Sequence, residues 1–211
     1  MRTTPELDFW LDPTPPSSVS TTAQEVKAAL CAAYGEPHRR YHDLSHIADC
    51  LAELRATPGL TDAERLRLAH AIWWHDVVYD PTRSDNEAQS ADLAERDLAR
   101  LGASADEIAE TSRLIHLTVG HRTQDGDRMG ALMVSIDLSI LGRAADAYDA
   151  YAQAIAEEYA HVPEPLFRAG RAAVLGKMLA SAPLFPDPAF RQRFEAAARS
   201  NLEREIARLT T

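Results

Sequence analysis

The most informative segment of the chain is Ala69-His70-Ala71-Ile72-Trp73-Trp74-His75-Asp76-Val77-Val78-Tyr79. Apolar residues recur at helical intervals in and just before it, at Leu66, Ala69, Ile72 and Trp73, which predicts an apolar helix. A histidine and an aspartate, His75 and Asp76, lie in the same apolar run. A buried carboxylate is costly unless a positive charge or a metal accompanies it. The segment contains no Lys or Arg, so that charge must come from elsewhere in the fold.

A second apolar run, Leu132 to Leu141, contains a single aspartate, Asp137, and again no Lys or Arg. The same physical argument applies to this carboxylate, which also needs a positive partner. The part from Met133 to Ile140 is too evenly apolar to be assigned as helix or strand from its period.

His46 lies on a third segment, an amphipathic helix with Ile47, Leu51 and Leu54, and can face the same interior. Taken singly, His46 is explained as a helix-face histidine, His75 as a ring tethered by Asp76, and Asp137 as a helix cap. Together they predict a divalent metal site with the ligands His46, His75, Asp76 and Asp137. Imidazole and carboxylate ligands suit Mn, Fe, Co, Ni, Zn or Mg and disfavour calcium.

Most of the remaining chain is predicted to be helical. Four capping boxes mark expected helix starts, at Thr22/Glu25, Thr61/Glu64, Ser84/Glu87 and Ser104/Glu107. We find no convincing alternating strand. We therefore expect an all-α protein with one domain over residues 21–211, a bundle of about eight or nine helices. Residues 1–20 form a Pro/Ser-rich arm, which Phe9 and Trp10 are expected to pin to the bundle.

The composition of the chain argues against several classes of partner and location. The chain has 211 residues and a formal net charge of -10, without a Lys/Arg-rich run, which argues against a nucleic-acid polymer as partner. No apolar stretch approaches the roughly 20 residues that span a bilayer, and no signal peptide is recognisable. Cys31 and Cys50 are interpreted as small core hydrophobes. We expect a cytoplasmic protein.

The order His46, His75-Asp76, Asp137 resembles the H…HD…D signature of the HD superfamily of metal-dependent phosphohydrolases. Four segments also resemble a bacterial subgroup of predicted HD phosphohydrolases, namely Tyr41 to Ile47, Trp74 to Asp80, Asp85 to Ala91 and Asp137 to Gly142. The likeness extends from about His38 onward. It implies an all-α fold and metal-assisted cleavage of a phosphate ester or anhydride, often in a nucleotide.

This hydrolytic reading assigns provisional roles to further residues. A metal-activated water would attack phosphorus, with proton transfer by Glu87, Asp80 or Asp85. Glu87 is equally explained by its capping box. His121 is a candidate additional ligand or catalytic residue, although a helix-end position explains it too. Arg40, His42 and Arg171 are the candidates for contacts with a small phosphorylated substrate, expected to be a nucleotide.

Two other functions remain open. A di-iron oxygenase on the same scaffold would need additional ligands, for which His116 and His121 are available. A non-catalytic sensor would bind a nucleotide or metal without turnover. A homodimer also remains open, since long helices can leave apolar faces exposed.

Overall fold

The computed structural model describes residues 5–12 and 19–211, and every regular element in those ranges is helical. The elements are α1 (Pro5–Leu11), α2 (Thr21–Tyr34), α3 (Leu44–Ala56), α4 (Asp62–Trp74), α5 (Asn86–Leu101), α6 (Ala105–His116), the 3-10 helix η1 (Leu117–Val119), α7 (Arg128–Asp137), the 3-10 helix η2 (Leu138–Gly142), α8 (Ala145–Glu158), α9 (Glu164–Ala180) and α10 (Pro188–Thr210). The prediction of an all-α bundle is confirmed.

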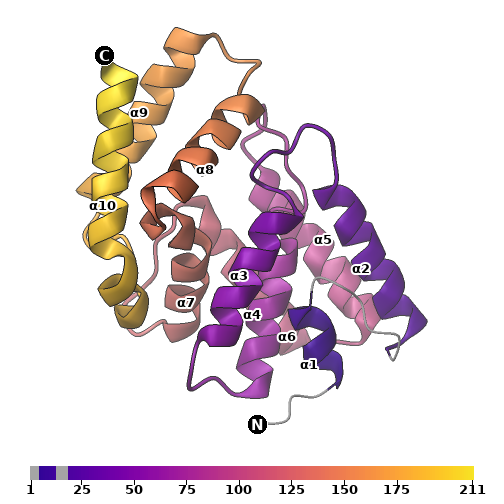
Figure 1. Ribbon diagram of the computed structural model, residues 1–211. Helices are drawn as coiled ribbons and strands as arrows, with labels where there is room; N and C mark the ends of the chain where they lie inside the picture. The colour runs from indigo at the N-terminus through magenta and orange to yellow at the C-terminus, as the bar shows by residue number, and fades with distance from the viewer. Residues whose placement is uncertain (1–4, 13–18) are drawn as a thin grey trace.

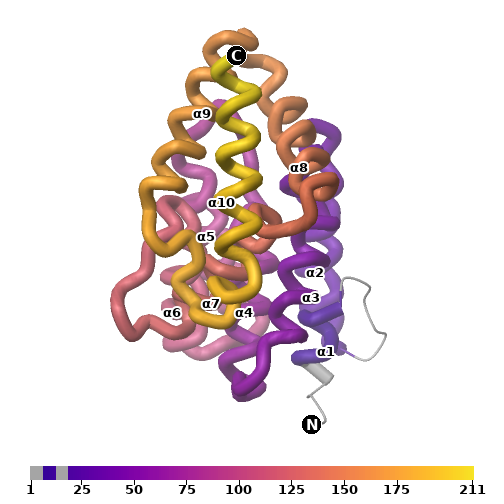
Figure 2. The backbone as a smooth tube through the Cα atoms, turned by 60° about the vertical axis from the view of Figure 1, so that its left-hand side comes forward, coloured from indigo at the N-terminus to yellow at the C-terminus, as the bar shows by residue number. Residues whose placement is uncertain are grey.

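Helix α4 is the central element, and it packs against α1, α3, α5, α6 and α7 (Figure 1). Every residue from Leu68 to Trp74 is buried. This explains why the apolar character of α4 extends around the helix rather than along one stripe. Figure 2 shows α9 and α10 side by side, and these two helices pack against each other at some distance from α1 and α2.

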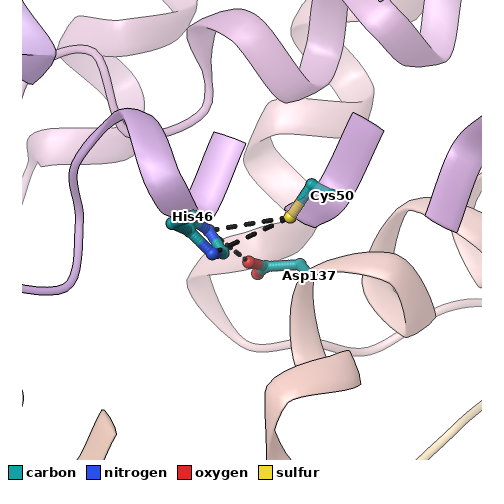
Figure 3. Close-up of side chains that lie close together, drawn as sticks. All are labelled: His46, Cys50 and Asp137. Atoms are coloured by element: carbon teal, nitrogen blue, oxygen red, sulfur yellow. Dashed lines mark hydrogen bonds and ion pairs between the residues drawn. The ribbon is translucent and has the colours of Figure 1, made fainter. Parts of the chain in front are cut away.

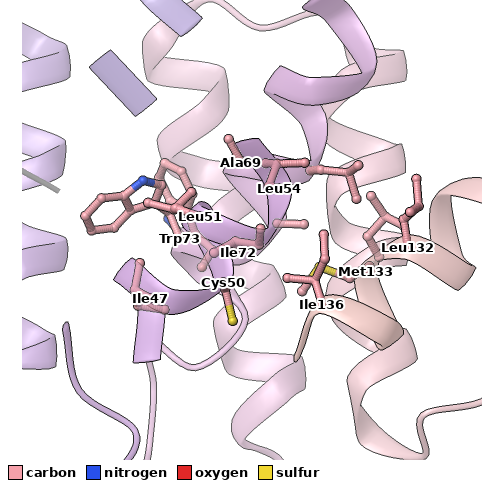
Figure 4. Close-up of a cluster of buried hydrophobic side chains, with 14 of the residues drawn as sticks. Ile47, Cys50, Leu51, Leu54, Ala69, Ile72, Trp73, Leu132, Met133 and Ile136 are labelled. Atoms are coloured by element: carbon pink, nitrogen blue, oxygen red, sulfur yellow. The ribbon is translucent and has the colours of Figure 1, made fainter. Parts of the chain in front are cut away.

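The core beneath the site is built from α3, α4 and α7 (Figure 4). Ile47, Leu51, Leu54, Ile72 and Met133 all have a relative exposure of 0%. Burial of each such side chain contributes about 1.5–3 kcal/mol relative to its exposure. These three helices carry the predicted metal ligands or end next to them, so the packing of the core also sets the position of the site.

Two capping boxes are confirmed, Thr61/Glu64 on α4 and Ser104/Glu107 on α6. The Thr22/Glu25 prediction is wrong, because α2 begins two residues earlier than a Thr22 cap requires. Its N-cap is Ser20, whose side chain accepts a hydrogen bond from the Ala23 amide. The spacing of a hydroxyl and a glutamate alone cannot distinguish these two starts, since Ser20 is also a good cap.

The N-terminal arm contains a short helix, α1, that docks on the bundle. Phe9 and Trp10 are buried, as expected of residues that pin the arm. The Trp73 indole N–H donates to the Trp10 carbonyl over 2.7 Å, and the Lys27 ammonium donates to the carbonyls of Phe9 and Asp12. Most of the Pro/Ser-rich stretch lies outside the described residues.

The run from Met133 to Ile140, which the sequence left undecided, is helical throughout, first as α7 and then as η2. Its side chains are buried or partly buried because α7 packs against α3, α4 and α6, and η2 packs against α10 and α8. Over the described ranges, no helix combines the length and the apolar character required to cross a bilayer.

Candidate metal centre

The four predicted ligands converge from three places in the fold. His46 lies in the first turn of α3, His75 is the C-cap of α4 with Asp76 next to it, and Asp137 is the last residue of α7. The start of α3 is held by Asp43, whose carboxylate accepts hydrogen bonds from the amides of Ser45 and His46. Helix ends thus bring together residues separated by up to 91 positions (137 − 46).

The donor atoms lie at ligand-to-ligand distances. His46 Nε2 is 3.2 Å from His75 Nε2, 3.2 Å from Asp137 Oδ1 and 3.7 Å from Asp76 Oδ2. His75 Nε2 is 2.9 Å from Asp76 Oδ2 and 3.4 Å from Asp137 Oδ1. Ligands about 2.1 Å from one ion are separated by about 3.0 Å in an octahedron and about 3.4 Å in a tetrahedron. We call these four atoms the four-donor cluster.

The tautomer of His75 leaves its Nε2 atom free to bind a metal. His75 Nδ1 lies 2.9 Å from the Ile72 carbonyl, which only accepts, so Nδ1 carries the proton. In the neutral ring, Nε2 then presents its lone pair to the other donors. A backbone carbonyl that orients a histidine in this way is the usual support of a metal ligand.

The electrostatics of the cluster also call for a cation. Burial lowers the pKa of His75, but the carboxylates of Asp76 and Asp137 outweigh it and raise this pKa well above its usual value. Burial would raise the pKa of each carboxyl, yet their histidine partners hold both pKa values low. Two buried carboxylates among neutral rings carry two negative charges, which a divalent ion can balance, whereas one bound proton balances only one of them.

Cys50 belongs to a second group of potential donors, with His46 and Asp137 (Figure 3). Its sulfur is 3.8 Å from both ring nitrogens of His46. Being equidistant from the two nitrogens, the sulfur packs on the side of the ring rather than along the Nε2 lone pair. Burial holds the Cys50 thiol protonated, with a pKa well above its ordinary value. We therefore describe Cys50 as packing on His46, as its interpretation as a core residue anticipates.

His121 lies beside the cluster. Its Nε2 is 2.9 Å from Asp137 Oδ2, the carboxylate oxygen that does not face His46 and His75. Its φ is 52°, a left-handed conformation that a non-glycine residue seldom adopts.

The alternative explanation of Asp137 as a helix cap fails, because its side chain makes no cap hydrogen bond to η2.

Glu158 organises the other side of the site, and the sequence offered no role for it. Its Oε1 accepts hydrogen bonds from the backbone amides of Arg40, Tyr41 and His42 at 2.8–3.0 Å. Its Oε2 accepts from His42 Nδ1 and from the Tyr79 hydroxyl, both at 2.7 Å. The His42 ring is thereby fixed with Nδ1 protonated, and no hydrogen bond of its Nε2 is found within the described residues. The one available signal was that Glu158 lies in the part of the chain, from about His38 onward, over which the likeness to the subgroup extends.

Arg39 is a second residue that sequence reasoning missed. Its side chain is fully buried, and it donates to the carbonyls of His42, Asp76 and Val77 at 2.7–2.9 Å. It therefore joins the segment after α4 to the segment before α3. The neighbouring Arg40, which the sequence favoured, is half-exposed. It donates to the carbonyls of Pro37 and Arg39 and lies 3.5 Å from Glu157.

The three acidic candidates for proton transfer, Asp80, Asp85 and Glu87, differ in their contacts. The Ser84/Glu87 capping box is wrong, because the N-cap of α5 is Asp85 and it makes no side-chain cap hydrogen bond. Instead, Asp85 binds Arg83 through two hydrogen bonds. Glu87 is partly buried and is close enough to Tyr159 to raise the pKa of that phenol, whose main cause is burial.

Asp80 is engaged in a local turn, where its Oδ1 accepts hydrogen bonds from the amide and hydroxyl of Thr82. The Asn86 side chain holds the Asp80 backbone, which docks this turn on α5. Arg171 is nearly buried, and its guanidinium donates hydrogen bonds to Glu205 on α10. This arginine, a predicted substrate contact, is therefore paired within the fold. No described hydrogen bond or ion pair links Asp80 or Arg171 to the four-donor cluster.

Comparisons of the chain with models of known families, with curated proteins and with solved structures find no match. The chemistry of the site is therefore inferred from its own residues. They include histidine, aspartate and cysteine groups that can hold a metal ion.

Proposed function

We propose that this protein is a metal-dependent phosphohydrolase that cleaves a phosphate ester or anhydride of a small molecule, a nucleotide being the expected class. The observation that carries the proposal is the four-donor cluster, in which the two imidazole nitrogens are 3.2 Å apart and each lies 2.9–3.7 Å from an oxygen of Asp76 and of Asp137. The resemblance to the HD superfamily, which rests on the order of the same four residues, supports it independently of the geometry.

His46, His75, Asp76 and Asp137 would hold the ion. A divalent metal bound there supplies a Lewis acid for a phosphoryl oxygen and lowers the pKa of a bound water. The chain itself contributes preorganisation. The Ile72 carbonyl orients His75, and His121 holds the outer oxygen of Asp137. These contacts fix the ligands before substrate arrives, which is what a precise metal site requires.

His42 is the proton donor that the geometry favours over the acidic candidates. Glu158 holds its Nδ1, its ring lies 6.1 Å from that of His46, and the side chain is 21% exposed. Burial lowers the pKa of His42, but its bond to the Glu158 carboxylate and the nearby carboxylates prevail and raise it, so the ring can also carry a proton on Nε2 and donate it to a leaving oxygen at the edge of the cluster. Asp80 is engaged by Thr82, while Glu87 remains available as a base.

The test is the metal content of the purified protein by mass spectrometry, followed by a screen of phosphate esters. About one transition metal per chain is expected in the wild type, and its loss in both His75→Ala and Asp137→Ala. A protein that holds no metal after reconstitution with Mn, Ni or Fe would refute the proposal. His42→Asn should keep the metal, and should slow an alkyl phosphate far more than p-nitrophenyl phosphate, whose leaving group needs no proton.

One observation favours a second candidate function, a di-iron oxygenase. The two oxygens of Asp137 face different histidines, His46 and His75 through Oδ1 and His121 through Oδ2. A carboxylate placed in this way can bridge two ions. Near two irons per chain, with iron-dependent oxygen uptake and no phosphate release, would place the oxygenase first.

A further inference from the structure

Four rings in mutual contact, one pair stacked and two pairs edge to face, lie beside the four-donor cluster. Tyr79 stacks on His42 with ring centroids 4.3 Å apart, His42 contacts Tyr41 at 5.0 Å, and Tyr41 contacts Tyr151 at 4.5 Å. These rings reach the metal ligands through Tyr41, whose ring lies 4.8 Å from that of His46. We call these four residues the aromatic wall.

The wall is accessible although it adjoins a buried cluster. All four of its residues are partly exposed, whereas His46 and His75 are buried. The rings come from three separate segments, before α3, after α4 and within α8, and Glu158 joins two of them through His42 and Tyr79. A surface assembled from distant segments and held by a buried carboxylate is rigid, and rigid aromatic surfaces suit the binding of flat rings.

The two arginines whose guanidinium groups lie over Tyr79 and Tyr151 are already engaged. The guanidinium of Arg171 lies over Tyr151, but it donates to Glu205. Arg39 lies over Tyr79 with a fully buried side chain, and its donors are bonded to carbonyls and to Glu36. Neither guanidinium is available for a second phosphate. A chain of phosphates extending from the cluster along the wall would meet rings rather than cations.

We propose that the aromatic wall binds a planar ring in the leaving group, so that the substrate is a phosphomonoester of a ring-bearing alcohol, of the nucleoside monophosphate type. This inference rests on the proposed function for the cleavage step, and on the wall alone for ring binding. It places Tyr151 as a residue that determines specificity without touching the ion. The monoester linkage follows because one phosphoryl group occupies the cluster and the next group along the substrate meets the wall.

Ring binding is tested first on the metal-free protein, by calorimetric titration with adenosine and with uridine. Base–aromatic stacking predicts that Tyr151→Leu raises the Kd of both about tenfold. The matched control is Tyr159→Leu, because the Tyr159 ring packs with His161 and Phe167 instead of the wall. Equal binding by wild type and Tyr151→Leu, or no binding by the wild type, would overturn the inference.

Kinetics with the metal-loaded protein give the second test. Adenosine monophosphate should be cleaved with a higher kcat/KM than adenosine triphosphate or glycerol phosphate. Tyr151→Leu should lower kcat/KM for the monophosphate about tenfold more than it lowers kcat/KM for glycerol phosphate, and the protein should keep its metal. A wild type that prefers the triphosphate or glycerol phosphate refutes the substrate class but keeps the hydrolase. A loaded protein that cleaves no phosphate ester refutes the hydrolase, while adenosine binding still reports on the wall.

Discussion

Replacement of Glu158 by glutamine removes one charge and keeps the shape of the side chain. Burial disfavours the charged carboxylate, but its bonds to His42, to the Arg40 amide and to Tyr79 prevail and lower its pKa from the ordinary 4.5 to about 2. At about 1.4 kcal/mol for each pKa unit, this difference corresponds to about 3 kcal/mol. The raised pKa of His42 reflects the same ion pair, so the two effects are not added.

The direction of the pH dependence follows because folding lowers the pKa of the Glu158 carboxyl group. The stabilisation is fully present above pH 4.5, and it is lost as the pH falls from 4.5 through about 2. We therefore expect Glu158→Gln to lower the free energy of unfolding at pH 7 by about 3 kcal/mol. The wild type should approach the stability of the variant as the pH falls towards 2.

Urea unfolding of the metal-free protein, followed by circular dichroism between pH 7 and pH 2.5, measures this difference. Glu157→Gln is the matched control, because Glu157 is the preceding residue and its side chain is 50% exposed. Its expected effect is less than about 1 kcal/mol. A Glu158→Gln protein as stable as this control at pH 7, or a difference that does not shrink in acid, would refute the role assigned to Glu158. In the metal-loaded enzyme, Glu158→Gln should slow the cleavage of an alkyl phosphate more than that of p-nitrophenyl phosphate, as His42→Asn is expected to do.

Three further predictions concern other parts of the molecule. His70 is buried with no partner for its Nε2, and burial lowers its pKa from 6.5 to about 4, so unfolding free energy should fall by about 3 kcal/mol between pH 6.5 and pH 4. Urea titrations should show that this part of the pH dependence disappears in His70→Leu, and an unchanged slope would contradict the assignment. Trp10→Ala should lower thermal and urea stability by about 3–5 kcal/mol because the indole is 1% exposed, and an effect below about 1 kcal/mol would mean that α1 is not docked in solution. Cys50→Ala should retain the metal that Asp137→Ala loses, and mass spectrometry showing equal loss would make Cys50 a ligand.

The fold class was accessible from local patterns. The apolar period around Ile72 and two of the capping boxes reflect interactions within one helix, which sequence records directly. Where a prediction of this kind failed, as at Ser84/Glu87, the local signal competed with a contact from outside the helix. Asn86 holds the Asp80 backbone there, and Arg83 takes the Asp85 carboxylate that would otherwise cap α5.

The residues of the four-donor cluster were predictable for a related reason. An aspartate in an apolar run is costly to bury, so the sequence alone shows that Asp76 and Asp137 need a partner. The surroundings of the cluster were not predictable, because Glu158, Arg39 and Tyr151 are ordinary residues of helices and loops. Their roles arise only when segments far apart in the sequence are packed together, as Glu158 and His42 are across 116 positions. Long-range packing, which no local pattern encodes, determines which carboxylate supports a histidine and which arginine is already engaged.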